Sequence, residues 1–312
     1  MLKAHRRWSA IVLSFLVSTL CLACHRAGQG SSPIVVGSAD SPEQMVIGKM
    51  TVSALRSAGY KVVDKTGLGT PAVVRAALEA GNIDVCWEYT GDAWLNHLKH
   101  DFPIANPQEA YEKVRAEDAL NQLAWLRPAP YQRTLALLMR EQDAQAHGIG
   151  NMSELARYMA HQEPGLRLCV PQELYDKGSG IRGLERVYRL HFQEEGVRFL
   201  PIQEGYKALQ GGECDCALGL SGDSDPAAKG LRALRDDRGF FQASNLAPVV
   251  RMPVLRELPE LERILGELSC LLTQEAVVDI QRQVAEGSKP QTIARRFLAK
   301  SRSIRSLMQN RK

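Results

Sequence analysis

The residues best suited to binding chemistry lie in two short segments, 67–75 and 83–91. The first begins with two glycines that permit a tight backbone, followed by Thr70, which can cap a helix starting at the next residue, a proline. A helix start offers free N–H groups and the positive end of the helix dipole, and both favour a carboxylate. The second segment contains Trp87 and Tyr89, whose π-faces favour a cation. Together the two segments predict a site for a small zwitterion.

Short apolar runs alternate with amphipathic stretches along the chain, which predicts an α/β fold. Strands are predicted at residues 34–37, 61–64, 83–87, 166–170, 197–200 and 214–220. Helices are predicted at residues 43–57, 73–80, 107–123, 152–159, 181–188 and over most of 258–298. The strand alternation gives Trp87 and Tyr89 the same face. Tyr89 follows the end of a strand, where the loops of an α/β sheet meet the ligand.

The N-terminus has the features of an export signal. Three basic residues precede an apolar run at residues 8–23, which has signal-peptide length and is short for a membrane span. A small residue before Cys24 is typical of lipoprotein signals, so Cys24 is the predicted lipid anchor, although Cys21 stands where such signals usually have Leu. An uncleaved anchor or ordinary cleavage is the alternative. The polar residues 24–33 are predicted to form a flexible tether.

The charge balance gives no indication of a polyanionic partner. The chain has 39 basic and 35 acidic residues, and removing the three basic residues before Cys24 leaves 36 against 35, a net charge of +1. A nearly neutral mature chain does not favour nucleic acid or an anionic membrane surface.

The mature chain keeps an odd number of cysteines: Cys86, Cys169, Cys214, Cys216 and Cys270. At least one is therefore unpaired unless the protein dimerises. Cys214 and Cys216 are expected on one face of a strand, either as small buried residues or with a disulfide to Cys169. A metal site is not expected because a second pair of ligands is missing, and no cofactor is predicted. No triad or phosphate-binding motif indicates an enzyme.

Several segments resemble the glycine betaine/carnitine/choline family of ABC-transporter substrate-binding proteins, especially its OsmF/YehZ-like branch. The matching segments lie at residues 36–38, 43–44, 67–78, 88–91, 125–130, 183–185, 236–241 and 247–251. The resemblance implies a type II periplasmic-binding-protein fold. Two α/β lobes are then joined by two crossover strands, with the ligand in the cleft between them.

The same resemblance divides the chain. The signal peptide covers residues 1–23 and the tether 24–33. Lobe one comprises residues 34–136 and 247–312, and lobe two comprises 137–246. The crossings are expected near residues 135–139 and 246–250. A polar stretch after Met139 supports the first crossing, and the second rests on the resemblance.

The predicted ligand-binding residues are Gln44, Thr70, Trp87, Tyr89, Thr90, Tyr131, Tyr175 and Asp223. Gln44 and Thr70 match family positions at two helix starts and are expected to face a carboxylate. Tyr89 is the first candidate for a cation. The alternatives are a core position for Trp87, a plain helix cap for Thr70 and a packing role for Tyr89.

The predicted second lobe departs from the family at four positions: Leu135, Ser179, Gly222 and Asp225. An aromatic residue, an acid, a threonine and an arginine are usual there. Tyr131, Gln132 and Arg133 stand nearby and can compensate. The departures predict weak binding of glycine betaine itself.

The resemblance implies a solute-binding lipoprotein on the periplasmic or cell-surface side of a membrane. It would deliver a betaine-, choline- or carnitine-like compound to ABC permease subunits, without nucleic acid as a partner. Two alternatives keep the fold: a different ligand such as an amino-acid derivative, or a receptor or scaffold lipoprotein without a transport role. A third is an exported enzyme that uses Cys86 or the pair Cys214 and Cys216.

Overall fold

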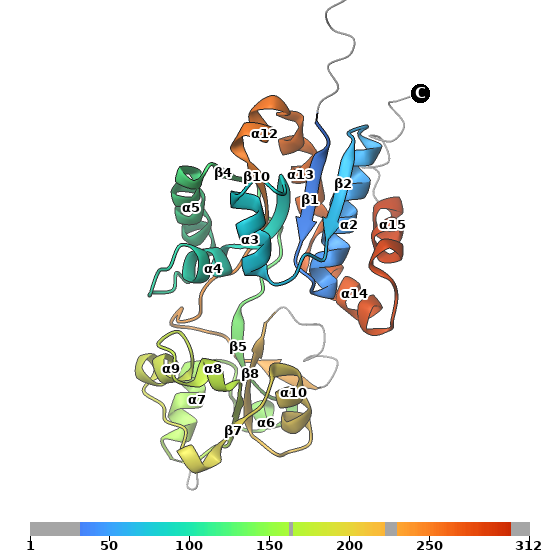
Figure 1. The fold of residues 1–312 in the computed structure, drawn as a ribbon. Helices are drawn as coiled ribbons and strands as arrows, with labels where there is room; N and C mark the ends of the chain where they lie inside the picture. Colours follow the sequence, from blue (N-terminus) through green and yellow to red (C-terminus); the bar gives the residue numbers. More distant parts are fainter. Residues whose placement is uncertain (1–31, 162–164, 222–229, 301–312) are drawn as a thin grey trace, which may run out of the picture. The chain divides into compact units, whose positions relative to one another are not determined.

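The computed structural model describes residues 32–161, 165–221 and 230–300 of the 312-residue chain. These residues form two five-stranded sheets with helices on both faces of each, so the predicted α/β class is confirmed (Figure 1).

The first sheet contains the N-terminal strands and one strand from the C-terminal part of the chain. Its order is β2 (Val62–Thr66), β1 (Ile34–Ser38), β3 (Val85–Tyr89), β10 (Leu246–Arg251) and β4 (Leu123–Trp125). Strand β1 is parallel to β2 and β3, whereas β10 runs antiparallel between β3 and β4. In the β3–β10 register Tyr89 lies opposite Leu246.

Side-chain alternation along β3 divides the first lobe into two cores. Val85, Trp87 and Tyr89 pack on the face covered by α2 (Pro42–Ser57). Cys86 packs on the opposite face. The first face is also covered by the C-terminal helices α13 (Glu260–Leu271), α14 (Gln274–Ala285) and α15 (Pro290–Lys300), and α15 packs against α2. The second face carries α3 (Pro71–Glu79) and α5 (Pro107–Asp118). Successive side chains of a strand point to opposite faces of the sheet, so the residues of β3 are divided between the two cores.

The second sheet repeats this plan with another part of the chain. Its order is β7 (Val197–Phe199), β6 (Leu168–Val170), β8 (Cys216–Leu220), β5 (Leu135–Arg140) and β9 (Leu231–Ala233). Strands β6, β7 and β8 are parallel, and β5 runs antiparallel between β8 and β9. One face packs on α7 (Met152–Met159) and α9 (Ile181–Tyr188), and the other on α10 (Ile202–Gln210).

Shorter helical segments complete the described part. They are α4 (Thr90–Asp92), a π-helical turn (Ala93–His97), α6 (Glu141–Ala146), α8 (Gln172–Tyr175), α12 (Met252–Glu257) and 3-10 turns at Ala119–Asn121 and Glu194–Gly196. None of the helices in the described ranges is long and apolar enough to cross a membrane. The predicted signal segment and Cys24 lie outside those ranges.

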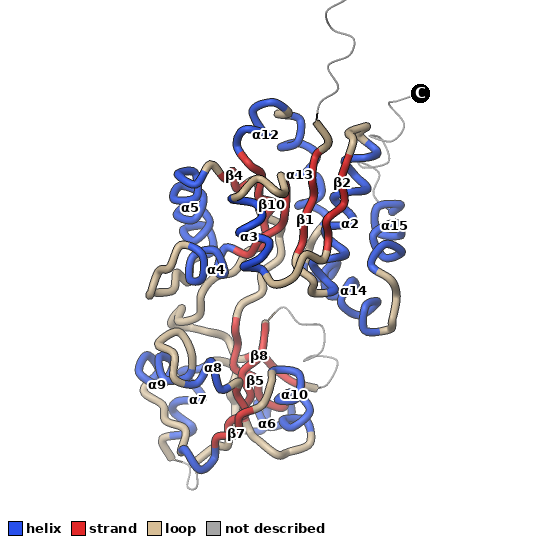
Figure 2. The backbone as a smooth tube through the Cα atoms, in the orientation of Figure 1, coloured by secondary structure: helices blue, strands red, loops and turns tan. Residues whose placement is uncertain are grey.

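Two loop segments connect the sheets (Figure 2). They are held together where Gln132 pairs with Asn245 in an isolated antiparallel bridge, and where the Arg133 N–H donates to the Ser244 carbonyl at 2.9 Å. The residues expected to cross, 135–139 and 246–250, lie within β5 and β10, each in one sheet. The connection thus precedes each of these strands, and the exact lobe boundaries stay a prediction.

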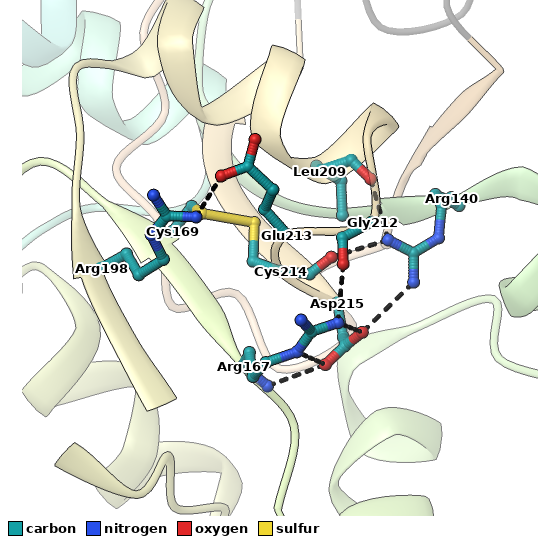
Figure 3. Close-up of a disulfide and its surroundings, with 9 residues drawn as sticks. All are labelled: Arg140, Arg167, Cys169, Arg198, Leu209, Gly212, Glu213, Cys214 and Asp215. Atoms are coloured by element: carbon teal, nitrogen blue, oxygen red, sulfur yellow. Dashed lines mark hydrogen bonds and ion pairs between the residues drawn. A yellow bond between two sulfur atoms is a disulfide. The ribbon is translucent and has the colours of Figure 1, made fainter. Parts of the chain in front are cut away.

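A disulfide joins Cys169 on β6 to Cys214 before β8 (Figure 3). The expectation that Cys214 and Cys216 share one face is wrong, because β8 begins only at Cys216. Cys169 and Cys214 lie in the core under α10, whereas Cys216 lies in the core on the opposite face. Cys216 is therefore free and buried, as is Cys86, and Cys270 is free and exposed.

Asp215 reinforces the disulfide from the next position in the chain. Its carboxylate accepts hydrogen bonds from the Arg167 guanidinium at 2.8 and 3.0 Å and from Arg140 Nη2 at 3.2 Å. Figure 3 shows both guanidinium groups converging on this carboxylate. Burial opposes ionisation of Asp215, but these donors outweigh it and lower its pKa. The start of β6, the end of β5 and the turn before β8 are thereby tied together.

Candidate functional site

A cavity of about 130 Å³ lies in the first lobe, where β1 and β3 end. Because these strands are parallel, their carboxyl ends meet at one edge of the sheet, which is where α/β proteins usually bind ligands. The cavity is lined by the first turn of α2, the first residue of α3, the end of β3, the turn that follows it, and Arg133 from the connecting segment.

The loops before α2 and α3 hold the two helix starts next to each other. The Asp40 N–H donates to the Gly69 carbonyl at 2.9 Å, and the Gly67 N–H donates to the Ser38 carbonyl at 3.2 Å. Gly67 and Gly69 have φ of 82° and 133°, in the region that favours glycine. The predicted tight backbone at these glycines is confirmed, and it brings Ser41 and Pro71 to one cavity.

Trp87 and Tyr89 form the aromatic part of the lining. Each side chain is only 4% exposed and belongs to the core beneath α2. The Trp87 indole N–H donates to Thr51 Oγ1 at 2.8 Å. The Tyr89 hydroxyl donates to Glu43, whose second oxygen accepts from Gln281 Nε2 at 2.7 Å. Trp87 thus belongs to the core and also lines the cavity, and its part in ligand binding stays a prediction.

Gln44 gives the cavity an unsatisfied polar group. It lies in the first turn of α2, is 6% exposed, and its Oε1 has no hydrogen-bond partner among the described residues. A buried amide oxygen without a partner is unfavourable, so this position suits a polar ligand atom or water. Thr70 stands at the start of α3 but makes no side-chain cap and is exposed. It lines a separate cavity with Asp92 and His97.

The remaining predicted site residues do not line this cavity. The Thr90 hydroxyl is buried and accepts from the Asn245 N–H at 2.9 Å. Tyr131 packs edge-on against Tyr89 at 6.3 Å between ring centroids and is 1% exposed. Tyr175 lies in the core of the second sheet. Asp223 lies outside the described residues, as do Gly222 and Asp225.

Arg133 is the main residue whose position the sequence did not predict. Its Cζ lies 4.3 Å from the centroid of the Tyr89 ring, and its guanidinium lines the cavity. Burial opposes its charge, but the nearby Tyr89, Glu43 and Asp92 outweigh this and raise its pKa. Arg133 lies in a loop, where no periodicity of apolar residues indicates which way a side chain points. The only signal in the sequence was the position of Arg133 close to Tyr131.

A buried ion-pair network beneath the cavity joins residues of three family-like segments, 67–78, 88–91 and 125–130. Arg75, in segment 67–78, donates to Asp118 at 2.7 Å. It also donates to Glu88, in segment 88–91, at 3.3 Å. The indole N–H of Trp125, in segment 125–130, donates to Asp118 at 2.7 Å. Burial raises the pKa of Glu88 to about 7, despite the opposing effect of Arg75. This network holds β3 and the start of α3 together.

The Cys86 thiol, one of the candidate nucleophiles, is buried. Burial raises the pKa of the Cys86 thiol well above its usual value, which disfavours the thiolate that a nucleophile needs. Within the described ranges no group of three or more His, Cys, Asp or Glu side chains is placed to hold a metal ion. What the cavity offers is two aromatic rings, an amide, carboxylates and one guanidinium.

A family model described as the substrate binding domain of an ABC-type glycine betaine transport system matches residues 32–300. The chain belongs to this family. It is therefore the substrate-binding component of a glycine betaine-type ABC transport system, and the family is one of transport proteins rather than enzymes. The family predicted from the segments is confirmed.

Named relatives agree with this assignment. A glycine-betaine-binding protein of Pseudomonas aeruginosa is 32% identical over 300 residues, covering 91% of this chain and 94% of the relative. The glycine betaine-binding protein YehZ of Escherichia coli is 30% identical, covering 86% of this chain and 91% of the relative. The apo structure of YehZ has a TM-score of 0.71 at 29% identity, over 86% of this chain and 98% of that one. The two-lobe type II fold is confirmed.

Proposed function

We propose that this protein is an extracytoplasmic solute-binding lipoprotein that captures a small quaternary-ammonium or zwitterionic compound for an ABC importer. The observation that carries the proposal is the cavity at the ends of β1 and β3. There Trp87 and Tyr89 offer aromatic surface, and Gln44 offers an unsatisfied amide at a helix start. Aromatic faces attract organic cations, whereas helix starts attract carboxylates, so the combination suits a ligand with both charges.

The second lobe has a defined part in this proposal. We expect it to close over the cavity by a hinge movement at the two connecting segments, where Gln132 pairs with Asn245. The closed form would be the one that the permease subunits receive. Cys24 would carry the lipid that keeps the protein at the outer side of the membrane that holds the permease.

The test is a thermal-shift screen of the purified mature chain against glycine betaine, carnitine, choline, ergothioneine and common amino acids. A ligand that binds only the folded state raises the melting temperature in proportion to the logarithm of its concentration. We expect at least one trimethylammonium compound to give such a shift. Ergothioneine is included because a Helicobacter pylori relative, 26% identical over 93% of this chain, is named an ergothioneine transport permease/ergothioneine binding protein.

The screen separates the proposal from its alternatives. A shift with an amino acid and none with any trimethylammonium compound would favour an amino-acid derivative as ligand. No shift with any compound would favour a receptor or scaffold role and would contradict the transport proposal.

A further inference from the structure

Three carboxyl groups share the guanidinium of Arg75 next to the cavity. Arg75 is 4% exposed, and its Nη1 donates to Asp118 at 2.7 Å and to Glu88 at 3.3 Å. Its Nε donates to Glu79 at 2.6 Å. If all three carboxyl groups were ionised, the cluster would hold an excess of negative charge in a largely buried place. Such an excess is unfavourable, so one of the three is expected to keep its proton.

Two of the three carboxyl groups have their own means of staying ionised. Burial opposes ionisation of Asp118, but hydrogen bonds from Arg75, Asn121 and Trp125 outweigh it and lower its pKa. The side chain of Glu79 is 47% exposed, so water solvates its charge. The excess proton therefore belongs on the third carboxyl group.

That third group is Glu88, which is also the member of the cluster that lines the ligand cavity. It stands on β3 between Trp87 and Tyr89 and is 8% exposed. Besides Arg75, its described hydrogen-bond partner is the Cys86 thiol at 3.7 Å. Burial raises the pKa of Glu88 to about 7, although the charge of Arg75 opposes this. A proton thus lies beside the place where the cation of the ligand is proposed to bind.

The other titratable groups around Glu88 do not change state in the same pH range. Burial raises the pKa of the Cys86 thiol well above its usual value, so the thiol stays neutral. Burial, followed by the charge of Arg75, lowers the pKa of His97, which then titrates below Glu88. The remaining charged residues of the cavity lining are Asp40 before α2, Asp92 in α4 and Arg133 in the connecting segment.

We propose that Glu88 exchanges its proton for the ligand, so that capture of a positively charged ligand group is coupled to ionisation of Glu88 and weakens in acid. This inference rests on the proposed function and adds a regulation of the same cavity. A cation beside Glu88 stabilises its carboxylate, and by reciprocity the carboxylate strengthens binding of the cation. The proton passes to the solvent. Affinity is then highest above the pKa of the unliganded form and falls as the pH drops below it.

The experiment is titration calorimetry on the mature chain with glycine betaine and with choline, neither of which titrates itself near neutral pH. Each titration is run in phosphate and in Tris, whose different heats of ionisation reveal how many protons binding releases. We expect release of about half a proton at about pH 7 and of close to one proton at about pH 6. Affinity should be about tenfold weaker at about pH 6 than at about pH 8.

Three variants assign the proton. Glu88→Gln carries no exchangeable proton, so it should release none and should keep its affinity within about twofold between about pH 6 and pH 8. Glu79→Gln is the matched control, because Glu79 contacts the same guanidinium but does not line the cavity. It should release protons as wild type does. His97→Gln tests the other titratable group of the lining and should also keep the release. Circular dichroism and thermal melts confirm that each variant is folded.

The outcomes separate this inference from the proposed function. Binding without proton release, and with equal affinity in acid and base, would overturn the inference and leave the proposed function intact. Proton release that is lost in His97→Gln would also overturn it, by assigning the proton to His97. If Glu88→Gln does not fold, release by wild type that persists in His97→Gln and Glu79→Gln still supports the inference. Absence of binding by both compounds at every pH would contradict trimethylammonium recognition and overturn both.

Discussion

At the residue scale, Tyr89 joins the core of the first lobe to the cavity. Its ring is 4% exposed, its hydroxyl donates to Glu43, and one face of the ring supports the Arg133 guanidinium. Truncation to alanine would therefore remove a buried aromatic side chain, which costs on the order of 3–5 kcal/mol of stability. A Tyr89→Ala variant would therefore confuse unfolding with loss of the site.

Two milder substitutions separate these roles. Tyr89→Leu keeps apolar volume but removes the π-face, so we expect roughly tenfold weaker binding of the ligand identified in the screen. Tyr89→Phe keeps the ring and removes only the hydroxyl, so its affinity should stay within about threefold of wild type. Calorimetry on both folded variants is the measurement. If the leucine and phenylalanine variants bind the ligand with equal affinity, the Tyr89 ring does not contribute to ligand binding.

Glu88 gives a pH-dependent contribution to stability. Burial raises its pKa in the folded state from an ordinary value near 4.5 to about 7. The protonated form is thus favoured in the fold, and its contribution is complete below about pH 4.5 and is lost as the pH rises through about 7. The unfolding free energy of wild type should fall over this pH window. We expect the Glu88→Gln variant to lose less of it, by on the order of 2 kcal/mol.

Urea titrations at several pH values measure this effect. Glu79→Gln is the control, because Glu79 contacts the same guanidinium of Arg75 at 2.6 Å but is 47% exposed. The control should follow the wild-type pH profile. A Glu88→Gln profile as steep as that of wild type would show that Glu88 titrates as an ordinary carboxyl.

At the element scale, the Cys169–Cys214 disulfide fixes β6 to the turn before β8 across 45 residues. A crosslink of this span reduces the conformational freedom of the unfolded chain, which typically contributes about 2–4 kcal/mol. We expect the double variant Cys169→Ser, Cys214→Ser to lose stability in this range in urea denaturation. Addition of a reductant should lower the unfolding free energy of the wild-type protein toward that of the double variant. The control Cys270→Ser changes an exposed free thiol and should be neutral.

A large part of the element order followed from the sequence, because each strand and helix has its own period. Alternation placed Trp87 and Tyr89 on one face of β3, and the two faces of that strand do pack in different cores. The cysteine pairing did not follow, because the choice between Cys214 and Cys216 depends on where β8 begins. A shift of two residues at a strand end is within the usual uncertainty of a boundary.

The candidate site was predictable only in part, for physical reasons. Gln44 and the two aromatic residues belong to regular elements, so their positions follow from a period. The hydrogen bond from the Asn245 N–H to the Thr90 hydroxyl links residues far apart in the sequence, which no period predicts, and the role of Thr90 at the ligand stays a prediction. Arg133 belongs to a loop that has no period, and its stack on Tyr89 depends on a tertiary contact. Pairings between distant loops need the fold before they can be identified.

At the scale of the whole molecule, the proposed lipid anchor at Cys24 would determine where the protein acts. We expect Cys24→Ser to release the protein from the membrane fraction or to leave it with an uncleaved signal, since the lipid attachment point is gone. Detergent phase separation and the intact mass measure both outcomes. Cys21→Ser is the matched control and should remain anchored. Membrane fractionation and mass like those of wild type in Cys24→Ser would contradict lipidation at this cysteine.

The strand order has a consequence for how the chain folds as it emerges. Every strand of the second sheet lies between residues 135 and 233, so that sheet can complete itself from a continuous stretch. The first sheet lacks the strand between β3 and β4 until β10 has been synthesised. Helix α2 likewise lacks the helix that packs against it until α15 has been synthesised. Closing such a long loop is slow, and unpaired strand edges promote aggregation. The half of the molecule that is synthesised first is therefore the half that finishes folding last.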